Sequence, residues 1–332
     1  MPLPERQLIE RIQRSLKPPR GHSALVKGIG DDCAVLRLPA GHEALVTTDF
    51  SLEGVHFRRE WHAAEVVGHR CLTRGLSDIA AMGGQPIAAF LSLALPVGLD
   101  QKWVDGFLRG FTALAKNFGV ELAGGDTAQS PGGVLADIML LGSVPRGKAV
   151  LRSGAKVGDD IYVTGRLGVG LAALNRLLAG EEPARVLRDK TARKHFRPAP
   201  RIEVGQYLRE RKLACSMIDI SDGLSTDLKH ICDESGVSAW VAEEAIPVAS
   251  GATLEDALHG GDEYELVFTA RPAKHKSIPK SIAGVPITWI GTVTSDDSGE
   301  RKRTGGHKIW LMNNERGRSE LKPKGWEHFT KK

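Results

Sequence analysis

The stretch Lys27–Phe57 reads KGIGDDCAVLRLPAGHEALVTTDFSLEGVHF, and the rest of the chain is organised around it. Asp31 and Asp32 follow a glycine-rich turn, and a predicted strand, Ala44–Val46, leads into a second polar cluster that begins at Thr47. If the chain folds back here, the carboxylates of the two clusters repel one another unless a cation lies among them. Gly-Asp-Asp is also ordinary turn chemistry, so this stretch alone leaves a structural and a cation-binding interpretation open.

Length and composition indicate a soluble globular protein of two domains. The chain has 332 residues, of which 41% are hydrophobic and 26% are charged. We place the boundary near Pro145, where glycine and charged residues become frequent, which gives domains 1–143 and 144–332. No apolar run is long enough to span a membrane, and the N-terminal segment has no apolar signal core. We therefore expect a cytoplasmic protein with no membrane partner.

The net charge of +5 raises the possibility of nucleic-acid binding. Much of the basic excess lies in Arg185–Arg201 and in the C-terminal tail, however, whereas the candidate site is acidic. Aromatic residues make up only 5% of the chain, which is few for a base-stacking surface. We expect no nucleic-acid partner; a non-catalytic basic protein is the rival, which a salt-dependent binding assay would distinguish.

Strands and helices alternate along the predicted chain, which indicates an α/β class. Apolar runs predict strands over Ala44–Val46, Ile87–Leu95, Val120–Ala123, Val134–Val144, Asp160–Thr164, Ser216–Ile220, Ser238–Ala242, Leu266–Thr269 and, as the final strand, Ile287–Val293. Helical spacing predicts an opening helix that ends at Pro18, followed by helices over Ala63–Met82, Trp103–Phe118, Gly168–Leu178, Arg201–Arg211 and Leu224–Glu234.

Acids recur beside glycine or hydroxyl residues near the ends of predicted strands. The repeated groups are Gly30-Asp31-Asp32, Thr48-Asp49, Gly125-Asp126, Asp219–Gly223 and Gly261-Asp262-Glu263. One such turn is commonly structural, but this many favour a site of hard oxygen ligands, which suit Mg²⁺. Several clustered acids need several cations, and a polyphosphate would bridge those cations, as in phosphoryl transfer.

Asp78 adds a carboxylate inside the apolar stretch of the second predicted helix. Burying a lone carboxylate is costly, so Asp78 requires a partner or a metal ion. The alternative is a surface ion pair with Arg74, four residues earlier.

Seven motifs, taken in chain order, resemble the thiamine-monophosphate kinases, a family of the aminoimidazole-ribonucleotide synthetase-like ATP-binding superfamily. They are GIGDDCAV, TTDFSLEGVHF, GLSDIAAMGGQP, AGGDTA, LRSGAKVGDDIYVTG, MIDISDGLSTDLKHI and GGDEYELVF, and the resemblance covers essentially the whole chain. It implies direct in-line transfer of the ATP γ-phosphoryl group to thiamine monophosphate, with several Mg²⁺ ions, to give thiamine diphosphate. It also implies an α/β (α+β) two-domain fold whose N-terminal domains pair in a homodimer and form a shared β-barrel.

The resemblance further assigns roles to individual residues. The implied metal ligands are Asp32, Thr47, Thr48, Asp49, Asp78, Asp126, Asp219 and Asp222, of which Asp49, Asp78 and Asp126 are also catalytic. The implied ATP contacts are Gly125, Asp126, Arg152, Ser221 and Phe118, and the implied substrate contacts are His56, Asp262, Glu263 and Trp326. Structural alternatives remain for Phe118 in the core of its helix, for His56 as a hydrogen-bonded histidine and for Trp326 in packing of the tail.

The chain departs from the family pattern at two places. The family reads Gly-Gly-Glu-Asp where this chain has Asp262-Glu263, which leaves open which acid reaches the substrate. Arg70 and Gly75 replace the usual Lys and Asn before Asp78, so an amide beside that acid is missing. A synthetase of the same superfamily is the nearest rival, although no cysteine precedes Cys33 as the selenophosphate enzymes would require.

Overall fold

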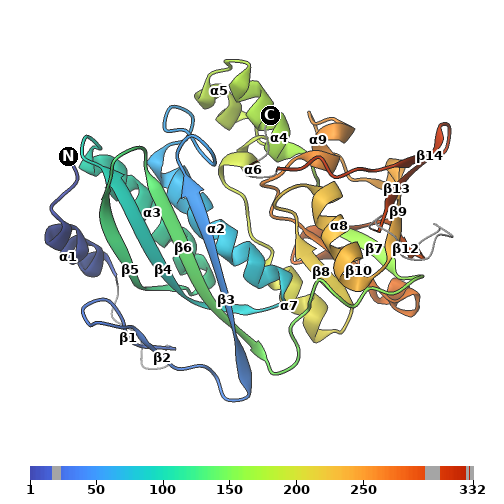
Figure 1. Cartoon of the computed structure of the whole chain (residues 1–332), viewed down its shortest axis with the longest axis horizontal. Helices are drawn as coiled ribbons and strands as arrows, with labels where there is room; N and C mark the ends of the chain where they lie inside the picture. Colours follow the sequence, from blue (N-terminus) through green and yellow to red (C-terminus); the bar gives the residue numbers. More distant parts are fainter. Residues whose placement is uncertain (17–23, 296–306, 327–328, 330–332) are drawn as a thin grey trace. The chain divides into compact units, whose positions relative to one another are not determined.

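The computed structural model describes residues 1–16, 24–295, 307–326 and 329, and Figure 1 shows its elements in chain order. The chain divides into two compact units. The N-terminal unit contains residues 1–79 and 84–148, and the C-terminal unit contains residues 80–83 and 149–332.

A four-stranded sheet forms the centre of the N-terminal unit. Its strands run in the order β3 (His42–Leu52), β6 (Leu135–Pro145), β4 (Gln85–Pro96) and β5 (Glu121–Ser130). β3 and β4 are antiparallel to β6, whereas β4 and β5 are parallel. In the described structure this sheet is open, with β3 and β5 as its edges. A closed barrel is therefore not formed within the described chain.

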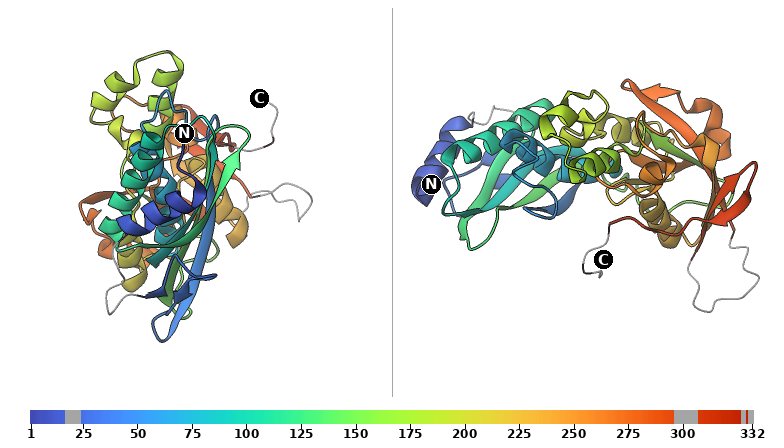
Figure 2. Two further views of the ribbon diagram at one scale, coloured as in Figure 1. Left: turned by 90° about the vertical axis from the view of Figure 1, so that its left-hand side faces the viewer. Right: turned by 90° about the horizontal axis from the view of Figure 1, so that it is seen from above.

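Helices cover one face of this sheet. α2 (Ala64–Ala81) and α3 (Gln101–Phe118) lie against it, and α1 (Glu5–Ser15) lies further from the sheet (Figures 1 and 2). The two long helices approach closely, because a side chain at Gly110 would meet the backbone oxygen of Glu65 at 1.9 Å. β1 (Leu25–Lys27) and β2 (Val35–Leu36) form a separate small ribbon.

Successive side chains of β3 point to opposite faces of the sheet, so its polar residues are divided between the two faces. The helix-covered face carries Leu45, Thr47, Asp49 and Ser51, all buried or half-buried. On the other face, Val46 is 64% exposed and Phe50 is 56% exposed. The uncovered face therefore presents large apolar side chains to solvent.

A mostly antiparallel sheet forms the centre of the C-terminal unit. Its order is β14 (Gly317–Glu320), β13 (Ile309–Asn313), β9 (Ser238–Ala242), β12 (Val285–Thr294), β7 (Asp160–Thr164), β10 (Leu266–Ala270) and β8 (Ser216–Asp219), with β11 (Ser281–Ile282) paired to β12. The helices are α4 (Val169–Leu178), α5 (Pro183–Arg188), α6 (Arg193–Phe196), α7 (Ile202–Glu210), α8 (Leu224–Ser235) and α9 (Leu254–His259). The core joins apolar residues of the sheet to Leu228 and Ile231 of α8 and to Leu258 of α9.

The predicted elements are present, with several corrections. Ile287–Val293 is not the final strand, because β13 and β14 follow it and extend the sheet. α9 lies where no helix was predicted, and it begins with a capping box at Thr253 and Asp256. The acids Asp49 and Asp126 lie inside β3 and β5 rather than beyond strand ends, because both strands continue through their polar segments.

Two further observations concern membrane segments and thiols. Among the described residues, no helix combines the length and the apolar character that a membrane span requires. All four cysteines are free, and Cys71 and Cys232 are buried.

Candidate functional site

Two carboxyl groups meet on the helix-covered face of the N-terminal sheet. Asp49 of β3 lies beside Asp78 of α2, and the Thr47 hydroxyl donates to Asp78 Oδ2. Burial, and then the negative charge of Asp78, raise the pKa of Asp49 to about 7. One carboxyl of the pair therefore holds a proton near neutral pH, which a divalent cation at the same oxygens would displace.

Thr48 and Asp126 lie on the opposite face of the sheet. Strand pairing places Asp126 beside Ser92 and Ser92 beside Asp137, so these side chains form one row across β5, β4 and β6. The Thr48 hydroxyl donates to Asp137 Oδ1 at 2.8 Å. The structure thus separates Thr48 from its neighbours Thr47 and Asp49, with which the sequence grouped it.

Asp137 was missed by the sequence reasoning. It is the single charged residue within the apolar strand β6, and that interruption of the apolar run was the available signal. The strand register was needed to place it beside Thr48 and in the same row as Asp126.

Asp32 lies in an exposed turn between β1 and β2. Its backbone N–H donates to the Asp31 side chain at 3.1 Å, and Asp31 in turn lies 3.7 Å from Lys27. These contacts agree with the structural interpretation, in which Asp31 and Asp32 belong to an ordinary turn. The structure gives no contact that brings Asp32 to the Asp49–Asp78 pair within the described residues.

The residues of this unit provide part of the ligand set that a Mg²⁺ ion requires. In the part of the chain that the structure describes, no three or more His, Cys, Asp or Glu side chains are arranged around one metal position. Mg²⁺ commonly binds to one or two carboxylates and takes its remaining oxygens from water and substrate phosphates. Asp49, Asp78 and the Thr47 hydroxyl provide such a set of hard oxygen donors.

Packing explains the missing amide before Asp78. A side chain at Gly75 would place its Cβ 3.0 Å from Leu140 Cβ and 3.6 Å from the Thr47 methyl group. A side chain at this position would therefore require Leu140 to shift by a few tenths of an ångström. Thr47 and Asp49 are among the polar neighbours of Asp78.

Three other candidates occupy well-defined local positions. Gly125 has φ +148°, and a side chain there would meet the backbone oxygen of Leu91 at 1.9 Å, so only glycine fits. His56 accepts a hydrogen bond from the Leu52 backbone at 3.0 Å, as the structural alternative requires. Phe118 is half-buried as the last residue of α3.

In the C-terminal unit, a single carboxylate shapes the loop after β8. Asp227 Oδ2 accepts the backbone N–H groups of Ser221, Asp222 and Gly223 at 3.0 to 3.1 Å. Burial, and then the charges of Asp219 and Asp222, raise the pKa of Asp227 well above its usual range. The sequence reasoning missed Asp227; its signal was an acid in the first turn of α8, where it can bind loop N–H groups.

The segment that contains Asp262 lies beside this loop. The Asp262 backbone donates to the Ser221 oxygen at 2.8 Å, and the Tyr264 backbone donates to the Ile220 oxygen at 2.9 Å. Asp262 has φ +58° and accepts the Tyr264 hydroxyl at 2.6 Å. The half-buried Asp262 is thus held next to Ser221 and Asp222.

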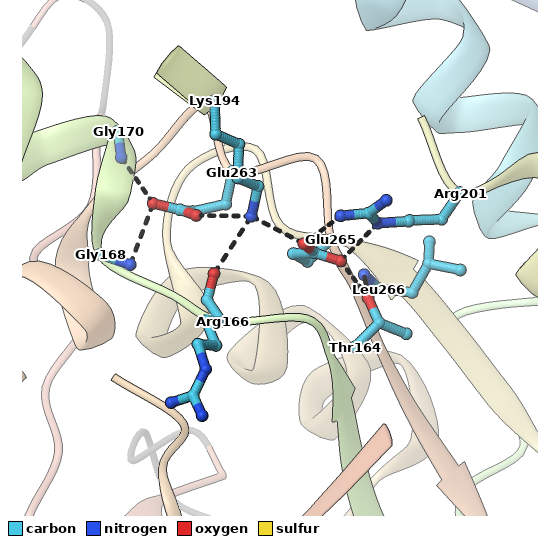
Figure 3. A network of polar contacts seen from close by, with 9 residues as sticks. All are labelled: Thr164, Arg166, Gly168, Gly170, Lys194, Arg201, Glu263, Glu265 and Leu266. Carbon is cyan, nitrogen blue, oxygen red and sulfur yellow. Dashed lines mark hydrogen bonds and ion pairs between the residues drawn. The ribbon is translucent and has the colours of Figure 1, made fainter. Parts of the chain in front are cut away.

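Glu263 is buried, and its carboxylate points towards Gly168, Gly170 and Lys194 (Figure 3). Its Oε1 accepts the backbone N–H groups of Gly168 and Gly170 at 3.0 and 2.8 Å, which caps the start of α4. Its Oε2 lies 3.3 Å from Lys194 Nζ. Burial raises the pKa of Glu263. Both oxygens of Glu263 are therefore engaged inside the unit.

The tail places Trp326 close to the same loop. The Trp326 backbone donates to the Asp222 oxygen at 3.3 Å, and the Gly325 backbone donates to the Thr226 hydroxyl at 3.2 Å. The Trp326 residue is 42% exposed, so its indole is not simply core packing. Arg152 is exposed, and its carbonyl oxygen accepts the Ser235 hydroxyl.

Family models define the class of protein. The model "AIR synthase related protein, N-terminal domain" matches residues 30–144, and "AIR synthase related protein, C-terminal domain" matches residues 156–303. The thiamine-monophosphate kinase of Salmonella typhimurium is 40% identical over 287 residues, which cover 82% of this chain and 85% of that protein.

Solved structures agree with this class. The thiamine-monophosphate kinase of Stenotrophomonas maltophilia K279a is 31% identical and covers 93% of this chain and 95% of its own, with a TM-score of 0.77. A structure described as "AaThiL complexed with AMPPCP and TMP" is also 31% identical and covers 97% and 96%, with a TM-score of 0.75. The chain belongs to the thiamine-monophosphate kinase family of the AIR synthase related proteins.

Proposed function

We propose that this protein transfers the γ-phosphoryl group of ATP to thiamine monophosphate and so forms thiamine diphosphate. The proposal is supported by the names of its relatives and by a related structure that holds AMPPCP and TMP. The structural observation that carries it is the neighbouring pair of carboxyl groups, Asp49 and Asp78, with the Thr47 hydroxyl beside them, since metal-assisted phosphoryl transfer requires clustered hard oxygens.

Mg²⁺ ions would be held by the acids and hydroxyls assigned by the resemblance. In the N-terminal unit these are Asp32, Thr47, Thr48, Asp49, Asp78 and Asp126, and in the C-terminal unit they are Asp219 and Asp222. When bound, Mg²⁺ supplies charge neutralisation for the phosphate groups of both reactants.

The protein's own groups bind and orient the reactants. A phosphate monoester has a second pKa of about 6 and is already largely ionised at neutral pH. The acceptor oxygen therefore needs no strong general base. The remaining task is to hold that oxygen in line with the γ-phosphorus, which alignment and fixed charges accomplish. We therefore propose direct transfer without a phosphoenzyme.

The nucleotide and the thiamine moiety require different side chains. We assign the ATP contacts to Gly125, Arg152, Ser221 and Phe118, together with Asp126. His56 and Trp326 are assigned to the substrate, since an exposed indole can cover a cationic thiazolium ring.

We assign the acidic substrate contact to Asp262 and a structural role to Glu263. Glu263 is 1% exposed, and its oxygens are taken by Gly168, Gly170 and Lys194. In this chain the longer acid at position 263 reaches the start of α4, where it accepts the Gly168 and Gly170 N–H groups. The left-handed backbone of Asp262 also suits the shorter acid better.

The N-terminal domain, residues 1–143, is proposed as the dimerisation domain as well as the ATP- and Mg²⁺-binding domain, and residues 144–332 as the second domain. Val46 and Phe50 expose a large apolar area on the uncovered face of its sheet, and β3 and β5 are open edges. Open edges and apolar faces favour association with a second copy. β4 is an inner strand, so a partner on this face would cover Ile87–Leu95 only through the side chains that point to this face.

The proposed reaction is tested by product analysis in a single turnover. Protein in excess is mixed with ATP, thiamine monophosphate and Mg²⁺, and thiamine diphosphate and ADP are quantified over time. We expect the two products to appear at equal rates and both to vanish when EDTA removes Mg²⁺. ADP release that precedes thiamine diphosphate, with a phosphorylated protein in between, would rule out direct transfer.

A further inference from the structure

A pocket of about 810 Å³ in the C-terminal unit is lined by an unusual concentration of basic side chains. Four cationic residues line it, Arg166, Lys190, Lys194 and Arg201, against one acid, Glu265. None of these five residues belongs to the metal, nucleotide or substrate contacts proposed above. The pocket therefore requires its own explanation.

The inner part of the pocket wall is electrically balanced (Figure 3). Arg201 contacts the Glu265 carboxylate through Nε at 2.6 Å and Nη2 at 2.5 Å. Lys194 Nζ lies 2.7 Å from Glu265 and 3.3 Å from Glu263. Two buried acids thus neutralise two cations, and this part of the wall is a structural ion network.

The outer part carries a surplus of positive charge. Arg166 is exposed and donates only to the Val248 backbone oxygen, at 3.3 Å, among the residues that the structure describes. Lys190 is exposed and has no ion pair with any described acid. Exposed cations are commonly just solvated, but here both line one concave volume of ligand size.

The other lining residues suit the body of a small molecule. Val169, Val248 and Pro286 provide apolar walls, and Thr191 and Ser250 provide hydroxyl groups. A phosphate monoester carries about 1.5 to 2 negative charges at neutral pH, which matches the two surplus cations. A single pocket with two surplus cations offers no track for a polynucleotide backbone.

We propose that this pocket binds a small phosphorylated molecule, whose phosphate group is held by Arg166 and Lys190. Arginine and lysine recognise phosphate through charge-assisted hydrogen bonds. The apolar walls and hydroxyls contact the rest of the molecule. This site is additional to the proposed ATP and thiamine monophosphate contacts.

The proposal is tested by calorimetric titration of the full chain with inorganic phosphate. EDTA is present throughout, so that the acidic residues assigned to Mg²⁺ repel the probe. The test variant is Arg166→Ala/Lys190→Ala. The matched control is Arg188→Ala/Lys276→Ala, which removes the same charge from exposed positions that do not line the pocket. Thermal melting checks that both variants fold.

We expect the wild type and the control to bind phosphate alike, and the test variant to bind at least about tenfold more weakly. Equal binding by the two double variants, or no binding by the wild type, would overturn the proposal. The titration is then repeated with Trp326→Ala, which alters a proposed substrate contact and no residue of this pocket. Unchanged phosphate binding is expected, whereas loss of phosphate binding would contradict a separate site.

Discussion

Asp126 is the residue at which a loss of charge alone is expected to stop the reaction. Its carboxylate is exposed on β5, and Oδ1 accepts the Thr127 backbone N–H at 2.8 Å, which an amide oxygen can also do. We predict that Asp126→Asn folds normally and lowers kcat at least ~100-fold, about 2.7 kcal/mol of transition-state stabilisation. Steady-state assays at saturating Mg²⁺ measure this effect.

A second aspartate of the same unit serves as the control for Asp126. Asp105 forms a bidentate ion pair with Arg11 at 2.7 and 2.6 Å and belongs to none of the proposed metal, nucleotide or substrate contacts. Asp105→Asn should retain kcat close to the wild-type value. A kcat for Asp126→Asn near that of this control would refute the catalytic assignment.

The neighbours Asp262 and Glu263 should respond to substitution in different ways. Asp262→Ala should raise KM for thiamine monophosphate while the urea midpoint of unfolding changes little. Glu263→Ala removes a buried acceptor of two N–H groups and the partner of Lys194, so we expect a loss of stability of roughly 2 to 4 kcal/mol. Urea unfolding and substrate titration measure both variants, and the reverse pattern would exchange the two roles.

At the scale of single residues, the sequence identified most of the acids but not the face of the sheet or the loop to which each side chain points. Asp49 and Asp78 were predicted from the acidic motifs and do lie together. Asp137 and Asp227 were missed, because their importance depends on strand register and on the shape of a loop. A linear sequence does not contain either property.

Among the elements, the charged network around Glu265 joins β7 and α6 to the residues that directly precede α7 and β10 (Figure 3). Burial opposes ionisation of Glu265, but Lys194 and Arg201 outweigh it and lower its pKa from 4.5 to about 2. A lowered pKa stabilises the fold above the unfolded pKa, and this stabilisation disappears as the pH falls from 4.5 towards 2. At neutral pH, the ionised Glu265 contributes on the order of 3 kcal/mol to the free energy of unfolding through its lowered pKa.

This linkage gives a prediction for Glu265→Gln. The difference in unfolding free energy between wild type and variant should be largest near neutral pH and shrink steadily below pH 4.5. Urea unfolding at a series of pH values measures it. Glu203→Gln, at an exposed position on α7, is the control and should show little difference at any pH. A difference for Glu265→Gln that is independent of pH would contradict the lowered pKa.

The sequence predicted most elements well because their apolar periods are clear. α2, α3 and β7 follow their predicted ranges within a few residues. β3 and β5 were predicted too short, because polar residues were taken to end them. In the structure these polar residues lie within the strands and point either to the acid pair under the helices or to solvent. β13 was missed because it is a short apolar run of five residues, and β14 was missed because its four residues are polar or glycine and fully exposed.

For the whole molecule, we predict a homodimer formed through residues 1–143. The exposed side chains of Val46 and Phe50 should lie in the interface. Light scattering at micromolar concentration should give twice the single-chain mass of 35.8 kDa. Phe50→Asp should shift the mass towards the single-chain value, because a desolvated charge opposes burial. A wild-type mass near 35.8 kDa would contradict the prediction.

The central claim is that the acceptor is a phosphate oxygen, and the choice between two acceptors tests it most directly. The hydroxyl group of thiamine must lose a proton to react, whereas the phosphate of thiamine monophosphate is already largely ionised at neutral pH. No residue of the proposed site is assigned as a strong general base. The measurement is ATP turnover with each acceptor at equal concentration. We predict ADP formation that depends on thiamine monophosphate and stays at background with thiamine; equal or faster turnover with thiamine, or none with thiamine monophosphate, would contradict the account.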